Sequence, residues 1–166
     1  GRGIDVHYHT VGNSAGIEET INSIVVPKKR IFTRDGIETF VPNDNEFCKQ
    51  LIFTNLVDFD MLWGHRRNVD AYAQGLKFFD RHLPNIMEVM SENDLLIITA
   101  DHGCDPTFKD TDHTRENVPV IIYGRNLKEP KKLDILESMA DIGATIADNF
   151  DVNKTFIGTS FLDKLK

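Results

Sequence analysis

The feature that most constrains this chain is an apolar run that ends in an aspartate and a histidine. Residues 94–100 read Asp-Leu-Leu-Ile-Ile-Thr-Ala, which is typical of a strand, and Asp101 and His102 follow directly. These two polar side chains at the end of a buried strand cost desolvation free energy unless a partner compensates them. A divalent metal ion would do so, because catalytic metal sites commonly combine carboxylate and imidazole ligands.

A second apolar run ends in the same way. Residues 51–57 read Leu-Ile-Phe-Thr-Asn-Leu-Val, which indicates a strand covered on both faces, and Asp60 and His65 follow. In α/β sheets, ligands bind outside the carboxyl ends of the strands. We therefore expect both Asp/His clusters at one edge of the sheet.

The long polar loop after His102 leads to another predicted strand, residues 118–123. This loop contains no crossover helix, so that strand should run antiparallel to residues 95–100. The connection then returns to the edge where the first strand ends, which places His113 near Asp101 and His102. A loop of this length without secondary structure of its own is usually functional.

Five side chains are therefore candidate metal ligands at one edge: Asp60, His65, Asp101, His102 and His113. This set is larger than a single catalytic zinc usually takes from a protein. It suits two divalent ions about 3.5–4 Å apart, the arrangement that phosphatases use. Residue type alone leaves manganese, zinc and iron open. For any one of these side chains taken alone, a helix-capping aspartate or a hydrogen-bonded core histidine is the simpler interpretation.

The remaining pattern predicts an α/β fold: a three-layer, mostly parallel sheet with one antiparallel strand, within a single domain of residues 1–166. Apolar residues recur at helical spacing in three segments, and two short strands fit within residues 30–41. The predicted helices cover residues 17–25, residues 69–82 with a continuation past Pro84 to residue 90, and residues 133–150.

Composition narrows the possible partners. The net charge of −7 argues against a broad nucleic-acid surface, and no apolar run is long enough to span a membrane. Two cysteines, Cys48 and Cys104, do not make a disulfide framework, so a reducing, cytoplasmic compartment is the expectation. Cys104 could be a thiolate ligand, but a half-buried bystander is the preferred interpretation.

Several motifs together closely resemble phosphopentomutase, a metal-dependent family within the alkaline phosphatase superfamily. They are Asn-Leu-Val-Asp-Phe-Asp at 55–60, Gly-His-Arg-Arg at 64–67, Thr-Ala-Asp-His-Gly at 99–103, Thr-Asp-His-Thr-Arg-Glu at 111–116, Asp-Ile-Gly-Ala-Thr at 141–145 and Gly-Thr-Ser-Phe-Leu at 158–162. The likeness is good over residues 50–163 and loose before them.

This resemblance implies an alkaline-phosphatase-like core and the interconversion of ribose 1-phosphate and ribose 5-phosphate, and of the deoxyribose pair. The substrate would be a pentose phosphate, and the cofactors two divalent ions, with manganese expected. By motif position, Asp60, His65 and His113 would hold one ion, and Asp101 and His102 would help hold the other. Nothing in the residues sets an oligomeric state.

The resemblance also shows departures. The family is much longer, and its N-terminal part supplies the phosphorylated threonine, a further metal-binding aspartate and a sugar-binding cap. The threonines of this chain near the clusters lie in other motifs: Thr99, Thr107, Thr111 and Thr114. The expectation is a C-terminal portion of the catalytic core, without the nucleophile segment and the cap, that is inactive alone. The family lysine near residues 10–13 is absent, and Cys104 replaces a more usual asparagine.

Three alternatives remain. Cofactor-independent phosphoglycerate mutase shares the Asp-His-Gly element, but its first Asp/His pair has three intervening residues rather than the four between Asp60 and His65. Its later histidine also lies further along than His113, which is eleven residues after His102. A more general phosphatase or sulfatase of the superfamily comes next. From another class, the chain could be a non-catalytic metal-binding domain, since the nucleophile is missing.

Overall fold

The computed structural model describes residues 4, 6–32, 38–42, 49–127, 129–152 and 157–165. Internal contacts divide the chain into two compact units. The first unit contains Gly1–Met90 with His102–Asn117, and the second contains Ser91–Asp101 with Val118–Lys166. Cys48 lies outside the described residues.

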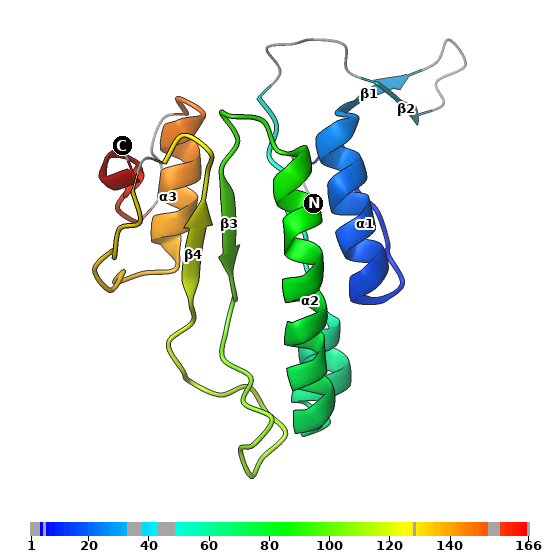
Figure 1. Cartoon of the computed structure of the whole chain (residues 1–166), viewed down its shortest axis with the longest axis vertical. Coiled ribbons are helices and arrows are strands. Elements are labelled where there is room, and N and C mark those ends of the chain that lie inside the picture. The colour runs from blue at the N-terminus through cyan, green and yellow to red at the C-terminus, as the bar shows by residue number, and fades with distance from the viewer. Residues whose placement is uncertain are drawn as a thin grey trace. The chain divides into compact units, whose positions relative to one another are not determined.

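The first unit is built on two helices, α1 (Gly12–Val25) and α2 (Val69–Val89), which lie against each other (Figure 1). The helix predicted over residues 17–25 is confirmed, although it begins earlier. Its start is fixed by a reciprocal pair: Asn13 N–H donates to Asp58 Oδ2 (2.8 Å), and Asp58 N–H donates to Asn13 Oδ1 (3.1 Å). The Asp58 carboxylate therefore satisfies a terminal N–H and complements the helix dipole.

Helix α2 is continuous, as the predicted continuation past Pro84 required. Asn68 caps its N-terminus by accepting a hydrogen bond from Ala71 N–H (3.1 Å). Gly75 lies where the helix meets the Trp63 ring, because a Cβ there would approach Trp63 Cζ3 to 2.1 Å. The missing side chain lets the segment before α2 pack directly on it.

A hairpin of β1 (Lys28–Phe32) and β2 (Glu38–Pro42) confirms the two short strands expected within residues 30–41. The two strands pair antiparallel, with Arg30 opposite Phe40.

The strand predicted over residues 51–57 is wrong. This run is not part of any sheet in the described chain, and Phe53 is 87% exposed. Only part of it packs on α1, where Leu56 lies against Gly16 and Thr54 bonds Thr20 (2.6 Å). An apolar run becomes a strand only when a neighbouring strand satisfies its backbone groups, and no described segment does so here.

In the second unit, β3 (Leu96–Thr99) pairs antiparallel with β4 (Val120–Tyr123) (Figure 1). Leu96 lies opposite Tyr123, and Thr99 lies opposite Val120. The strand predicted from the run before Asp101 and its antiparallel return are therefore confirmed. The α/β content is also confirmed. The sheets of the described residues are both two-stranded and antiparallel, so the three-layer, mostly parallel sheet is not found in them.

The last long helix, α3 (Ala140–Asn149), begins later than the predicted residue 133. Ser138 and Asp141 fix this start, because Ser138 Oγ accepts from Ala140 N–H (3.1 Å) and Asp141 Oδ2 accepts from Ser138 N–H (3.4 Å). This is a capping-box arrangement, and it outweighs the apolar spacing upstream. A final 3₁₀ turn, η2 (Leu162–Leu165), closes the described chain. No described helix combines the length and the apolar character needed to cross a bilayer.

The segment before η2 docks on α3 through a buried hydroxyl. Thr145 is 1% exposed; its Oγ1 donates to Asp141 O (2.7 Å) and accepts from Phe161 N–H (3.0 Å). Phe161 itself is 2% exposed. The hydroxyl therefore satisfies a backbone donor that has been removed from water.

We expect Thr145→Val to lower the free energy of unfolding by about 1–3 kcal/mol, since it leaves Phe161 N–H buried without an acceptor. Urea unfolding followed by circular dichroism measures this loss. The matched control is Thr20→Val in α1, whose hydroxyl donates to Gly16 O (2.7 Å) and meets Thr54 (2.6 Å) but satisfies no buried backbone donor, so its loss should cost at most about 1 kcal/mol. Equal stability of the two variants would contradict the assigned role of Thr145.

Candidate metal centre

A single π-helical turn, η1 (Phe59–Gly64), carries the first candidate ligand. His65 follows the turn directly, and its N–H donates to Asp60 O (3.0 Å), an i→i−5 hydrogen bond. Such turns are rare and occur mostly at functional sites. Because a π-helical turn contains one more residue than an α-helical turn, it brings Asp60 and His65 next to each other although four residues lie between them.

Aromatic packing and a tight exit hold this turn in place. The Phe59 ring meets Trp63 at 4.9 Å and Tyr72 of α2 at 5.2 Å, both edge to face. After the turn, Arg67 has φ of 54° and donates from its N–H to Gly64 O (2.9 Å). The left-handed region is uncommon for a residue other than glycine, so this sharp exit is a local backbone constraint beside the site.

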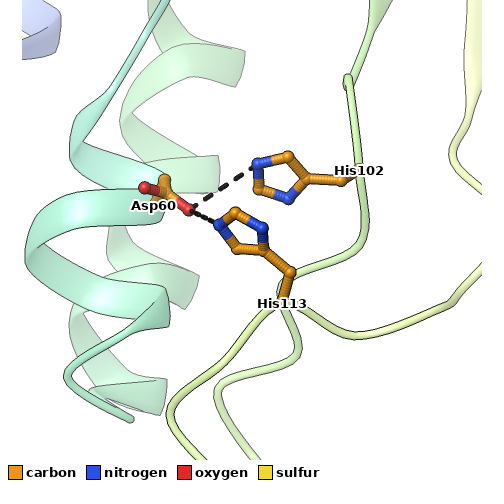
Figure 2. A group of neighbouring side chains, drawn as sticks. All are labelled: Asp60, His102 and His113. Atoms are coloured by element: carbon orange, nitrogen blue, oxygen red, sulfur yellow. Dashed lines mark ion pairs between the residues drawn. The ribbon is translucent and has the colours of Figure 1, made fainter.

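The second pair of ligands lies on the loop that follows β3. The His102 and His113 rings stack, with centroids 3.6 Å apart and planes inclined by 23° (Figure 2). An antiparallel bridge joins the residues next to them, since Thr114 N–H donates to Gly103 O (3.0 Å). The loop therefore returns on itself and presents both imidazoles together.

Four of the predicted ligands come together, because three histidines approach one carboxylate oxygen of the fourth residue, Asp60. Asp60 Oδ1 lies 3.2 Å from His65 Nε2, 3.2 Å from His113 Nε2 and 3.8 Å from His102 Nε2 (Figure 2 draws the last two). The Nε2 atoms of His65 and His113 are themselves 3.1 Å apart. Three imidazole nitrogens from two chain segments thus surround one acidic oxygen.

Backbone carbonyls set which nitrogen of each ring carries the proton. His65 Nδ1 bonds Thr111 O, and His102 Nδ1 bonds Gly103 O (3.1 Å). A carbonyl only accepts, so each Nδ1 must be the donor, and in the neutral ring each Nε2 lone pair faces Asp60. Metal-binding histidines are commonly oriented by such an outer hydrogen bond.

This donor set fits a cation. Asp60 Oδ1 is buried and makes no hydrogen bond of good geometry within the described chain, although three rings approach it. Two Nε2 lone pairs and a carboxylate oxygen that face one another repel unless a positive charge lies between them. The ligand atoms of Asp60, His102 and His113 all lie within 4.8 Å of one another, close enough to bind one ion or two neighbouring ions. Mixed imidazole and carboxylate sets suit zinc, manganese or iron.

Cys104 lies beside this group. Its thiol fills the space above Gly64, where a Cβ would approach the sulfur to 2.3 Å. Burial first, and then the neighbouring Asp60 charge, raise the pKa of the Cys104 thiol. A raised pKa disfavours the thiolate form that a metal ligand needs, and the role of Cys104 as a bystander stays a prediction.

Asp101 is the fifth predicted ligand. It belongs to the second unit, whereas the other four belong to the first, so its role as a ligand stays a prediction. Sequence reasoning missed the residues that hold the ligands. Asp58 caps α1 rather than facing the histidines, and Thr111 and Gly103 orient rings through their carbonyls. A backbone carbonyl can belong to any residue type, so the sequence gives no sign of the roles of Thr111 and Gly103. For the aspartates there was one sign: Asp58 and Asp60 are two residues apart, which indicates that only one of them faces the histidines.

The chain belongs to the Metalloenzyme superfamily, whose family model matches residues 15–154. That range contains every candidate ligand described above, so the converging side chains lie in the part of the chain that defines the family.

The curated relatives are named phosphopentomutase. The protein of Caldanaerobacter subterraneus subsp. tengcongensis is 47% identical over 165 residues, which cover 99% of this chain and 37% of the relative. That of Clostridium novyi is 51% identical over 79% of this chain and 34% of the relative. That of Carboxydothermus hydrogenoformans is 43% identical over 100% of this chain and 37% of the relative. The chain thus spans about a third of the length of these relatives, and the resemblance to phosphopentomutase is confirmed.

We expect Gly64→Ala to weaken metal binding and to destabilise the first unit, because the new methyl would also approach Phe59 O to 2.8 Å. Overpacking of this kind costs about 1–3 kcal/mol. The matched control is Gly143→Ala in α3, where nothing lies within 4 Å of the new Cβ. Because alanine is favoured over glycine inside a helix, this change should raise the free energy of unfolding by about 0.5–1 kcal/mol. Metal titration and urea unfolding of both variants measure the contrast, and a harmless Gly64→Ala would contradict the packing described.

Proposed function

We propose that this chain forms part of the metal centre of a phosphopentomutase, which interconverts ribose 1-phosphate and ribose 5-phosphate and the corresponding deoxyribose phosphates. The observation that carries the proposal is the convergence of three imidazole nitrogens on Asp60 Oδ1. The relatives that bear this name support the substrate class, because a pentose phosphate is the substrate their name implies.

The proposed cofactors are two divalent ions, with manganese as the expected metal. Asp60, His65 and His113 would hold one ion, which agrees with the shorter distances of 3.2 Å from Asp60 Oδ1 to both rings. His102, at 3.8 Å, would help hold the second ion together with Asp101. When bound, such a pair neutralises a transferring phosphoryl group and activates an oxygen nucleophile.

The chain's own residues would then act by holding and orienting. The carbonyls of Thr111 and Gly103 keep the His65 and His102 rings in the tautomer that presents Nε2. The π-helical turn fixes Asp60, and the bridge between Gly103 and Thr114 fixes the stacked pair. Ligands that are already in place when the ion binds need little reorganisation, which favours both affinity and catalysis.

We also propose that residues 1–166 are a C-terminal portion of a larger phosphomutase core with an alkaline-phosphatase-like, three-layer sheet. The share of the relatives that this chain covers supports this. The nucleophile segment and the cap would come from chain that is not in this sequence. A cytoplasmic location belongs to the same proposal and rests on the two cysteines, which do not form a disulfide framework.

A second candidate, a non-catalytic metal-binding domain, is favoured by one observation. Thr114, the threonine next to His113, has its hydroxyl engaged by Asp105 N–H and the Glu116 carboxylate, and Thr111 contributes its carbonyl. The Thr114 hydroxyl is therefore occupied in holding the loop rather than free to accept a phosphoryl group. The chain could therefore bind metal without turnover.

We expect His65→Ala and His113→Ala each to weaken Mn²⁺ binding by more than about 10-fold, since even the outer partners of metal ligands contribute that much. Elemental analysis and calorimetric titration measure the change. His82→Ala is the matched control, because that ring bonds Phe78 O (2.8 Å) within α2. Unchanged manganese stoichiometry in either ligand variant would remove that histidine from the site.

A chimera tests the activity itself. The 165 residues of the Caldanaerobacter relative that match this chain would be replaced by this chain. We expect the chimera to convert ribose 1-phosphate, whereas the 166-residue chain alone does not, because the threonines near the clusters lie in motifs other than that of the family's phosphorylated threonine. The same chimera with His113→Ala should lose turnover. An inactive but folded, metal-loaded chimera would favour the non-catalytic candidate, and turnover by the chain alone would refute its expected inactivity.

A further inference from the structure

The loop that carries His102 and His113 is closed by one buried threonine hydroxyl. Thr114 is 9% exposed. Its Oγ1 accepts a hydrogen bond from Asp105 N–H (2.8 Å) and donates to Glu116 Oε2. The directions are fixed, because an N–H can only donate and a carboxylate can only accept. The hydroxyl therefore ties the start of the loop to its end.

This tie acts next to both histidines. Asp105 lies three residues after His102, and Thr114 follows His113 directly. The backbone adds a second link, from Thr114 N–H to Gly103 O (3.0 Å). Together the two bonds fix both ends of the loop where the imidazoles emerge, and those rings lie 3.6 Å apart by their centroids.

Gly103 is a further requirement of this tie. A Cβ on Gly103 would approach Glu116 Oε2 to 2.2 Å and Thr114 O to 2.7 Å. The two segments thus come together as closely as backbone allows, and the Glu116 carboxylate occupies the place of the missing side chain. Without these contacts the loop would have to order itself at the cost of its closure entropy.

We propose that Thr114 is a positioning residue of the metal centre: its hydroxyl, held between Asp105 N–H and the Glu116 carboxylate, sets the separation of the His102 and His113 rings. Its effect on metal binding rests on the proposed function, whereas its effect on the rings does not. Thr114 binds no ion itself; it keeps two ligand rings at the spacing that an ion needs.

The first test reads the rings directly in the metal-free 166-residue chain. A nuclear Overhauser contact between the His102 and His113 ring protons is expected in the wild type. Thr114→Val keeps the shape but removes the hydroxyl, so the contact should be lost, and Thr114→Ser should restore it. A contact that persists in Thr114→Val, or one that Thr114→Ser fails to restore, overturns the proposal.

The second test titrates Co²⁺ as a spectroscopic probe of the same site. Thr114→Val should raise the dissociation constant about 10- to 100-fold, the usual effect of losing an outer partner of a metal ligand, and should change the visible absorption of the bound ion. Thr114→Ser and the remote control Thr20→Val should match the wild type. Equal affinity and spectra in Thr114→Val would leave the residue with a purely structural role and overturn the proposal.

Glu116→Ala covers the case in which Thr114→Val does not fold. Glu116 is exposed, so the variant should fold, but the hydroxyl loses the acceptor that orients it. We expect Glu116→Ala to weaken both the contact between the two rings and the binding of Co²⁺, each by less than Thr114→Val does. If neither changes, the proposal is overturned. If the wild type takes up no Co²⁺, the proposed metal centre fails, and the ring contact still decides the role of Thr114.

Discussion

The structure of the first unit depends on one electrostatic constraint, the meeting of three imidazole nitrogens at Asp60 Oδ1. Electron pairs from His65, His102 and Asp60 face a common point, and a buried carboxylate oxygen there has no hydrogen bond of good geometry within the described chain. Folding to this arrangement costs free energy unless a cation returns it. An arrangement with that cost is what a metal-binding site would show, in agreement with the Metalloenzyme superfamily to which the chain belongs.

Each side of the meeting point has its own rigid support. Asp60 and His65 are carried by a π-helical turn that packs through Trp63 against Gly75 of α2. His102 and His113 are carried by a loop that a backbone bridge and a threonine hydroxyl close. Neither support uses a charged side chain as its main contact with the ligands. The His65 and His102 rings are oriented by backbone carbonyls, which only accept hydrogen bonds, while the Glu116 carboxylate acts on the loop through the Thr114 hydroxyl.

The sequence predicted which side chains come together better than it predicted the path of the chain. Aspartates and histidines after apolar runs identified Asp60, His65, His102 and His113, and the antiparallel return of β4 explained how His113 comes near His102. The predicted strand over residues 51–57 failed because apolar character does not supply a hydrogen-bonded neighbour. The predicted start of the last helix was wrong because the apolar spacing extends upstream of the Ser138–Asp141 capping box, where the helix begins. The π-helical turn has no periodic signature, so only the coordinates reveal why Asp60 and His65 meet.

The π-helical turn makes the number of residues between Asp60 and His65 matter more than their identity. Met61 and Leu62 are 56% and 54% exposed, so their side chains can change without touching the ligands. Deleting either one would leave Asp60 and His65 four positions apart, and an α-helical turn still brings side chains at that spacing onto one face. Inserting a residue would instead put them six positions apart, and because each residue rotates an α-helix by about 100°, the two side chains would lie on different faces. Among descendants of this sequence, point changes inside the turn can therefore accumulate, whereas a codon gained there separates the pair.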